Sequence, residues 1–166
     1  MADPLKLLRA LLVTELNVAA DRVFVYNSKW NIPADDGLFV LVSFLRGKPY
    51  STGRWYEDTA DGLKEIQEMA VQETYTIDLF SRSAEARDRR NDVLFALNST
   101  AAQQMCETYS MKIGDLPTAF NDLSHIEASA RLNRYQLTFN VLRIERRERV
   151  APYYSDLTSP SLLIEP

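Results

Sequence analysis

Residues 69–79 read MAVQETYTIDL, and apolar side chains alternate with polar ones through most of this stretch. Successive side chains of a β-strand point to opposite faces of its sheet, so the pattern predicts a strand with one buried and one polar face. Upstream, Leu38 to Leu45 is apolar at nearly every position, which indicates a central strand covered on both faces. The two stretches together predict a sheet around which the rest of the chain packs.

Two helical segments flank these strands. Asp3-Pro4 is typical of a helix start, and leucines recur at three-to-four spacing as far as Leu16, which predicts an amphipathic helix of about three turns. From Ala84 to about Tyr109 a second apolar stripe with helical spacing predicts the longest helix of the chain. Both stripes provide an apolar side that can cover a sheet.

The other elements are shorter or less regular. Val23 to Tyr26 is rich in strand formers, whereas Arg46 to Gly62 is polar, aromatic and glycine-bearing, which favours a long hairpin loop that projects from the sheet. Two further strands are expected at about Ser124–Ala130 and Arg131–Glu148, with a β-bulge near Val141, where the apolar alternation changes phase.

This order predicts a single α+β domain over residues 1–150. A mixed or antiparallel sheet is packed by an N-terminal helix and one long helix, and it carries the extended hairpin loop. Residues 151–166 contain three prolines and two tyrosines, which favours an extended C-terminal arm.

Composition supports one core-stabilised domain. The 166 residues are 46% hydrophobic and 25% charged, which excludes disorder as the main state. The single cysteine, Cys106, cannot form a disulfide within the chain, so the core itself must stabilise the fold. No window approaches the roughly 18 consecutive apolar residues of a membrane-spanning helix, so no membrane association is expected.

Motifs for catalysis and for cofactor or metal binding are missing. The only histidine, His125, has no nucleophile motif nearby, and the glycine patterns of nucleotide-binding loops do not occur. Asp35-Asp36-Gly37 lacks the ligand spacing of a calcium loop and favours a turn. We therefore expect no enzyme, cofactor or metal site. An alternative is a small enzyme or ligand-binding domain with a polar cluster around His125 or among Asp35, Asp36 and Glu57.

Charge is distributed unevenly along the chain. The net charge is -4, yet residues 131–149 hold six arginines and two acids and carry +4. One interpretation is a solvated strand face with Arg–Glu pairs across strands. The other is a surface that meets an acidic partner, because guanidinium groups bind carboxylates and phosphates in fixed geometry. The arginines concerned are Arg131, Arg134, Arg143, Arg146, Arg147 and Arg149.

Large side chains also occur outside the core pattern, in the projecting segment and in the arm. Either they fold back over the domain or they contact other subunits, and their enrichment in Tyr, Trp and Arg favours subunit contacts. The candidates are Arg46, Tyr50, Arg54, Trp55 and Tyr56 in the projecting segment, and Tyr153, Tyr154, Leu162 and Leu163 in the arm.

The layout as a whole resembles a family of phage proteins. The order of the N-terminal helix, the strands Val23–Tyr26 and Leu38–Leu45, the long hairpin, residues 72–80 and the Arg/Asp-rich start of the next helix is similar to that in neck and tail-terminator proteins of tailed bacteriophages. These proteins are also called tail-completion or tail-to-head joining proteins. The resemblance covers about residues 1–150 and rests on the order and spacing of elements.

The resemblance implies a structural role in the virion. Proteins of this family form a homohexameric ring at the head-proximal end of the tail tube, end tube polymerisation and join tail to head at the neck. It implies contacts with tail-tube and head–tail connector proteins, DNA that passes through the lumen without specific binding, and assembly in the host cytoplasm. A tail-tube or head-completion subunit is the alternative within the virion.

Overall fold

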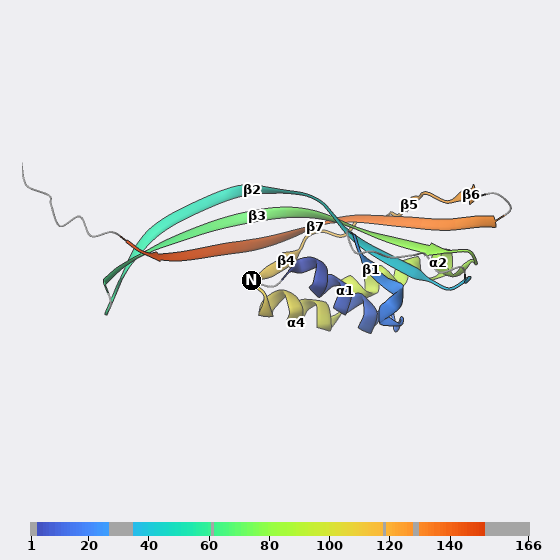
Figure 1. The fold of residues 1–166 in the computed structure, drawn as a ribbon, viewed down its shortest axis with the longest axis horizontal. Coiled ribbons are helices and arrows are strands. Elements are labelled where there is room, and N and C mark those ends of the chain that lie inside the picture. Colours follow the sequence, from blue (N-terminus) through green and yellow to red (C-terminus); the bar gives the residue numbers. More distant parts are fainter. Residues whose placement is uncertain (1–2, 27–34, 61, 118, 128–129, 152–166) are drawn as a thin grey trace, which may run out of the picture.

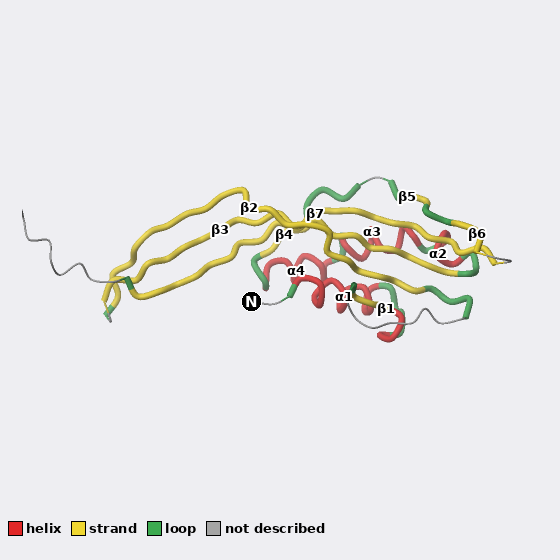
Figure 2. The backbone as a smooth tube through the Cα atoms, turned by 45° about the horizontal axis from the view of Figure 1, so that its top comes forward, coloured by secondary structure: helices red, strands yellow, loops and turns green. Residues whose placement is uncertain are grey.

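The structure is a computed structural model that describes residues 3–26, 35–60, 62–117, 119–127 and 130–151. It is a single α+β domain in which a mixed sheet packs against helices, as predicted (Figure 1). The helices lie along one half of a very long sheet, and the other half extends beyond them (Figure 2).

The first helix, α1 (Pro4–Glu15), follows its sequence signals closely. The Asp3 carboxylate caps it by accepting the N–H of Leu5 at 3.0 Å, and Asn17 ends the segment in a left-handed conformation with φ of 48°. Leu8 and Leu12 are completely buried against the sheet. Both the helix and its apolar face are therefore confirmed.

The single long helix predicted from Ala84 to Tyr109 is wrong. The segment forms α2 (Glu85–Asp88), α3 (Arg90–Leu97) and α4 (Thr100–Thr108). Arg89 leaves helical geometry with ψ of 4°, and Ser99 is extended and caps α4 by accepting the N–H of Ala102 at 3.1 Å. A serine that binds backbone N–H groups starts a new helix, which the apolar spacing alone does not reveal.

The main strands form one sheet in the order β1-β2-β3-β7-β4. The first pairing, β1 with β2, is parallel and the others are antiparallel. The short β5 and β6 also pair with β7. The bounds are β1 Val23–Val25, β2 Phe39–Thr59, β3 Gly62–Ser81, β4 Met111–Ile113, β5 Asn121–Asp122, β6 His125–Glu127 and β7 Ala130–Val150.

The core lies between the helices and one face of this sheet. Tyr75, Ile77 and Leu79 of β3 are at most 2% exposed and pack with the apolar side of α1, as their alternation predicts. The opposite face carries a smaller apolar cluster that contains Phe39 and Phe80. The central strand predicted at residues 38–45 is buried only as far as Ser43, because the exposed Phe44 and Leu45 begin a different region.

The loop conformation predicted for Arg46–Gly62 is wrong, because most of this segment is regular strand. The segment projects as expected, but β2 continues as regular strand to Thr59, and β3 begins at Gly62, whose φ is 113°. With β7 it forms a three-stranded sheet beyond the helices, which we call the ribbon: residues 46–59, 62–74 and 141–150 (Figures 1 and 2).

The bulge predicted near Val141 is also wrong, because β7 pairs with β3 in unbroken register from Asn133 to Val150. The register shifts lie in β2 instead, between Phe44 and Arg46 and between Pro49 and Ser51. Apolar residues change face after the buried Val141 because the ribbon has no helices to cover it. Ile144 is accordingly 47% exposed.

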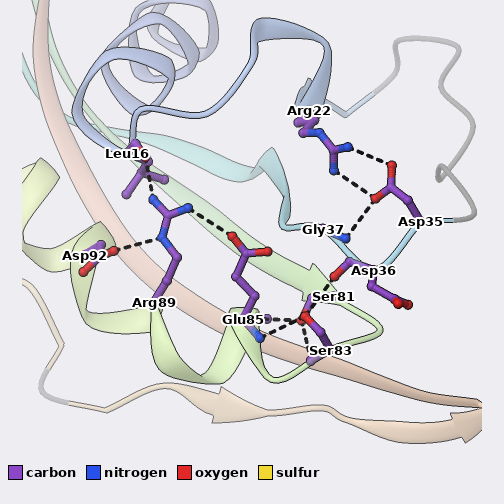
Figure 3. A network of polar contacts seen from close by, with 11 residues as sticks. Leu16, Arg22, Asp35, Asp36, Gly37, Ser81, Ser83, Glu85, Arg89 and Asp92 are labelled. Carbon is purple, nitrogen blue, oxygen red and sulfur yellow. Dashed lines mark hydrogen bonds and ion pairs between the residues drawn. The ribbon is translucent and has the colours of Figure 1, made fainter.

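A polar network holds the start of β2 against the helices (Figure 3). Arg89 donates to the carbonyl of Leu16 and to Glu85 and Asp92. Asp35 accepts the N–H of Gly37 at 2.9 Å and pairs with Arg22 at 2.7 Å, which lowers the pKa of the Asp35 carboxyl. These contacts agree with the turn expected at Asp35–Gly37.

Candidate functional site

The ribbon brings together most of the residues that the sequence singles out. Arg134 lies in the body of the sheet instead, the Arg131 side chain lies outside the described part, and so do Tyr153, Tyr154, Leu162 and Leu163. The candidates on the ribbon are Arg46, Tyr50, Arg54, Trp55 and Tyr56 from β2 and Arg143, Arg146, Arg147 and Arg149 from β7.

Apolar surface is exposed along the ribbon. Tyr50 is 57% exposed, Tyr56 50%, Ile144 47% and Val150 74%. Trp55 is partly covered, because Arg146 lies over its ring with 5.8 Å between guanidinium carbon and ring centroid. Exposed aromatic and aliphatic side chains on a projecting element are typical of a surface that contacts another protein.

Most of the arginines of β7 have partners within the chain. Asp78, Glu73 and Glu65 of β3 are 2%, 7% and 3% exposed. They pair with three guanidinium groups of β7 at 2.9, 2.9 and 2.8 Å, those of Arg134, Arg143 and Arg149 in the same order. The net charge of β3 is -3 and that of β7 is +4, so the charge split is largely balanced between adjacent strands.

These pairs agree with the cross-strand Arg–carboxylate contacts of the first interpretation, but not with its solvated face, because the three acids are buried. A contact of Arg134, Arg143 or Arg149 with another subunit stays a prediction. The buried acids of β3 were not recognised as partners from the sequence. One signal in the sequence could have revealed these partners, namely the acidic excess of the β3 segment and the basic excess of the β7 segment.

The junction between body and ribbon is fixed by one of these pairs. Tyr75 donates its hydroxyl proton to Glu73 at 2.6 Å, and Arg143 contacts both Glu73 at 2.9 Å and Glu145 at 2.6 Å. Burial and the bond to Glu73 raise the pKa of the Tyr75 hydroxyl, which therefore stays protonated as a donor. The network fixes side chains of β3 and β7 at the point where the ribbon leaves the helices.

A second pair, at the far end of the ribbon, makes its stability depend on pH. Gln67 and Arg149 donate hydrogen bonds to Glu65, and both lower the pKa of this carboxyl below its ordinary value of 4.5. A lowered folded-state pKa contributes stability that is present above the ordinary value and lost as the pH falls through the folded value. We expect the urea midpoint to fall on acidification below about pH 4.5.

The control is Glu65→Gln, which should flatten this acid dependence. The change is followed by the fluorescence of Trp55 in a Trp30→Phe background, because these are the two tryptophans of the chain. Equal acid dependence with and without the substitution would contradict a role for Glu65.

Three arginines of the ribbon, Arg46, Arg54 and Arg147, form no ion pair with a carboxylate of the described residues. Arg54 and Arg147 lie opposite each other across Gln67, on the face that carries the helices farther along the sheet. Both are exposed, and neither forms an ion pair with a carboxylate in the described residues. Together with Met69 and Thr52 they line a hollow of about 780 Å³. Glu68 and Glu145 line the same hollow, and the positive charge of Arg54 helps to lower the pKa of the Glu65 carboxyl, so the two cations are partly balanced by nearby acids.

The acids named for the catalytic alternative do not come together. Asp35 precedes β2 and Glu57 lies near its far end, which places them about 60 Å apart along a strand. Among the described residues no three His, Cys, Asp or Glu side chains are grouped as a metal site would need. Within the same residues no helix has the length and apolar character to cross a membrane.

No protein-family model and no curated protein sequence matches this chain.

Proposed function

We propose that the protein is a structural subunit of a tailed-phage virion that forms a hexameric ring at the head-proximal end of the tail. The ring ends polymerisation of the tail tube and joins the tail to the head. Its mechanism is geometric. A repeated heterologous contact closes the ring, one ring face matches the tube, and the other presents a different surface that tube subunits do not recognise.

The observation that carries the proposal is the ribbon. Three strands extend beyond the helices with exposed tyrosines and aliphatic side chains, and their buried Ile66 and Val71 belong to neither hydrophobic cluster of the described residues. A monomer gains little stability from such an element, whereas a ring subunit needs a rigid projection that reaches its neighbour. The junction network at Glu73 supplies that rigidity.

The charge of the ribbon is compatible with a position near DNA. Arg46, Lys48, Arg54 and Arg147 are exposed, while several other basic side chains are paired with carboxylates. Strong phosphate binding needs many uncompensated cations, and tight contacts would impede the passage of DNA. A few free cations in an acidic chain therefore suit a lumen that DNA crosses without specific binding.

The test is the mass of the assembled protein, measured by light scattering with and without the tail-tube protein of the same phage. We expect a species of about six times the 19.0 kDa chain mass, alone or on tube ends. A chain that forms long tubes by itself would be a tube subunit. A monomer that also fails to bind tube ends would contradict both assignments.

A further inference from the structure

The outer edge of β7 is paired in three short segments up to Arg143 and is open beyond it. Going along the strand, β6 pairs with residues 130–132, β5 with 135–136 and β4 with 141–143. Beyond Arg143 no described residue pairs with this edge. The seven residues 144–150 form an open strand edge. It continues the same edge of β7 that β4, β5 and β6 cover nearer the start of the strand.

The backbone of the open edge is ready to accept another strand. Asn140 directs its carbonyl outward to Gly114, at 2.7 Å, whereas Ala151 directs its N–H inward to Leu63, at 2.9 Å. Because alternate residues of a strand point the same way, the even-numbered residues direct N–H and C=O groups outward. In the open edge these are Ile144, Arg146, Glu148 and Val150.

The other long edge of the ribbon is less suited to strand addition. Along β2, Pro49 and two register shifts interrupt the edge, and Lys48 adds a charge. Prolines, bulges and lysines are devices that block the pairing of exposed strands. The pairing of β7 with β3 is unbroken, so no bulge interrupts the edge at residues 144–150.

We propose that the arm of a neighbouring copy adds as a strand to this open edge. The part of the arm that follows Ala151 has a stretch of seven residues between Pro152 and Pro160, which matches the seven open positions. Proline lacks the N–H of a ladder and so limits a strand on both sides. The arm carries two acids and no base, whereas the open edge holds three arginines and two glutamates.

The geometry at Ala151 favours a neighbour over the same chain. The bond from Ala151 to Leu63 continues the β3–β7 ladder, so the chain still runs outward at this residue. A tight hairpin back onto residues 144–150 would need Ala151 and Pro152 as its turn, with positive φ that neither residue readily adopts. An arm that continues to the next copy needs no such reversal, and repetition of the contact closes a ring.

The inference rests on the self-association part of the proposed function and not on the phage tail. It is tested by hydrogen exchange of the full chain over a range of protein concentrations. In the assembled protein we expect protection of the amides of Ile144, Arg146, Glu148 and Val150 that disappears on dilution to monomers. Protection that persists in the monomer would assign the edge to the chain's own arm and overturn the proposal.

Matched substitutions separate the backbone pairing from side-chain effects. Arg146→Pro removes an outward N–H, while Arg146→Ala removes the same side chain and keeps the N–H. In the arm, Leu157→Pro and Leu157→Ala form the second pair, which leaves residues 1–150 untouched. We expect each proline variant to associate at least about tenfold more weakly than its alanine counterpart.

These experiments distinguish a failure of the proposed strand addition from a failure of the proposed ring. Hexamers whose edge amides exchange freely, or proline variants that assemble like their alanine controls, would overturn the strand addition and leave the ring intact. A wild-type chain that stays monomeric even with tube protein would overturn the ring, and the strand addition with it.

Discussion

Replacement of Glu73 by alanine is expected to lower the free energy of unfolding by about 3–5 kcal/mol, because it removes one partner of a buried ion pair. Glu73 is 7% exposed and binds both Arg143 and the Tyr75 hydroxyl. Without it a largely buried guanidinium and a buried hydroxyl lose their acceptor. Urea unfolding followed by circular dichroism measures the change.

Two controls show whether the loss comes from the unpaired partners. Glu68→Ala removes an acid of the same strand that forms no ion pair in the described residues, and should change stability by less than about 0.5 kcal/mol. The triple variant Glu73→Leu, Arg143→Leu, Tyr75→Phe removes the three most buried polar groups of the network together, leaves only the partly exposed Glu145, and should recover much of the loss. Equal losses in the Glu73 and Glu68 variants would show that the junction network does not stabilise the fold.

The second large effect is expected on assembly. Tyr50→Ser with Tyr56→Ser removes two exposed aromatic side chains of the ribbon and should leave the monomer folded, because neither belongs to the core. Buried interface tyrosines often contribute 2 kcal/mol or more, so subunit association should weaken by at least about tenfold. Sedimentation velocity of the full chain measures the association.

A matched aromatic outside the ribbon provides the control. Phe95 on α3 is 74% exposed, and Phe95→Ser should leave association unchanged. If the Phe95 variant fails to assemble while the tyrosine variant assembles normally, the subunits meet through the helices, and the ribbon is not the interface.

Strong local signals made much of the fold predictable. The cap at Asp3 and the alternation from Tyr75 to Leu79 both correspond to observed elements, because burial of one face imposes a period on the sequence. The division of the segment after Ala84 into three helices was not predicted, because the capping role of Ser99 does not disturb the apolar spacing. The strands β4 and β5, of three and two residues, are too short to leave a periodic pattern.

The ribbon was only partly predictable. Arg46–Gly62 lacks apolar alternation because no helix covers these strands, so a regular strand there resembles a loop in sequence. The arginines of β7 were recognised as unusual, but two of their carboxylate partners, Glu73 and Glu65 on β3, lie 70 and 84 residues away in sequence. Only the strand register brings them together, and register is a property of the folded sheet.

The proposed ring at the end of the tail tube is tested most directly by electron microscopy of tail-tube protein assembled with and without this chain. We predict that the chain limits tube length and appears as a sixfold ring at one end of each tube. Tubes of unchanged length with bare ends, or tubes built by this chain alone, would contradict this prediction.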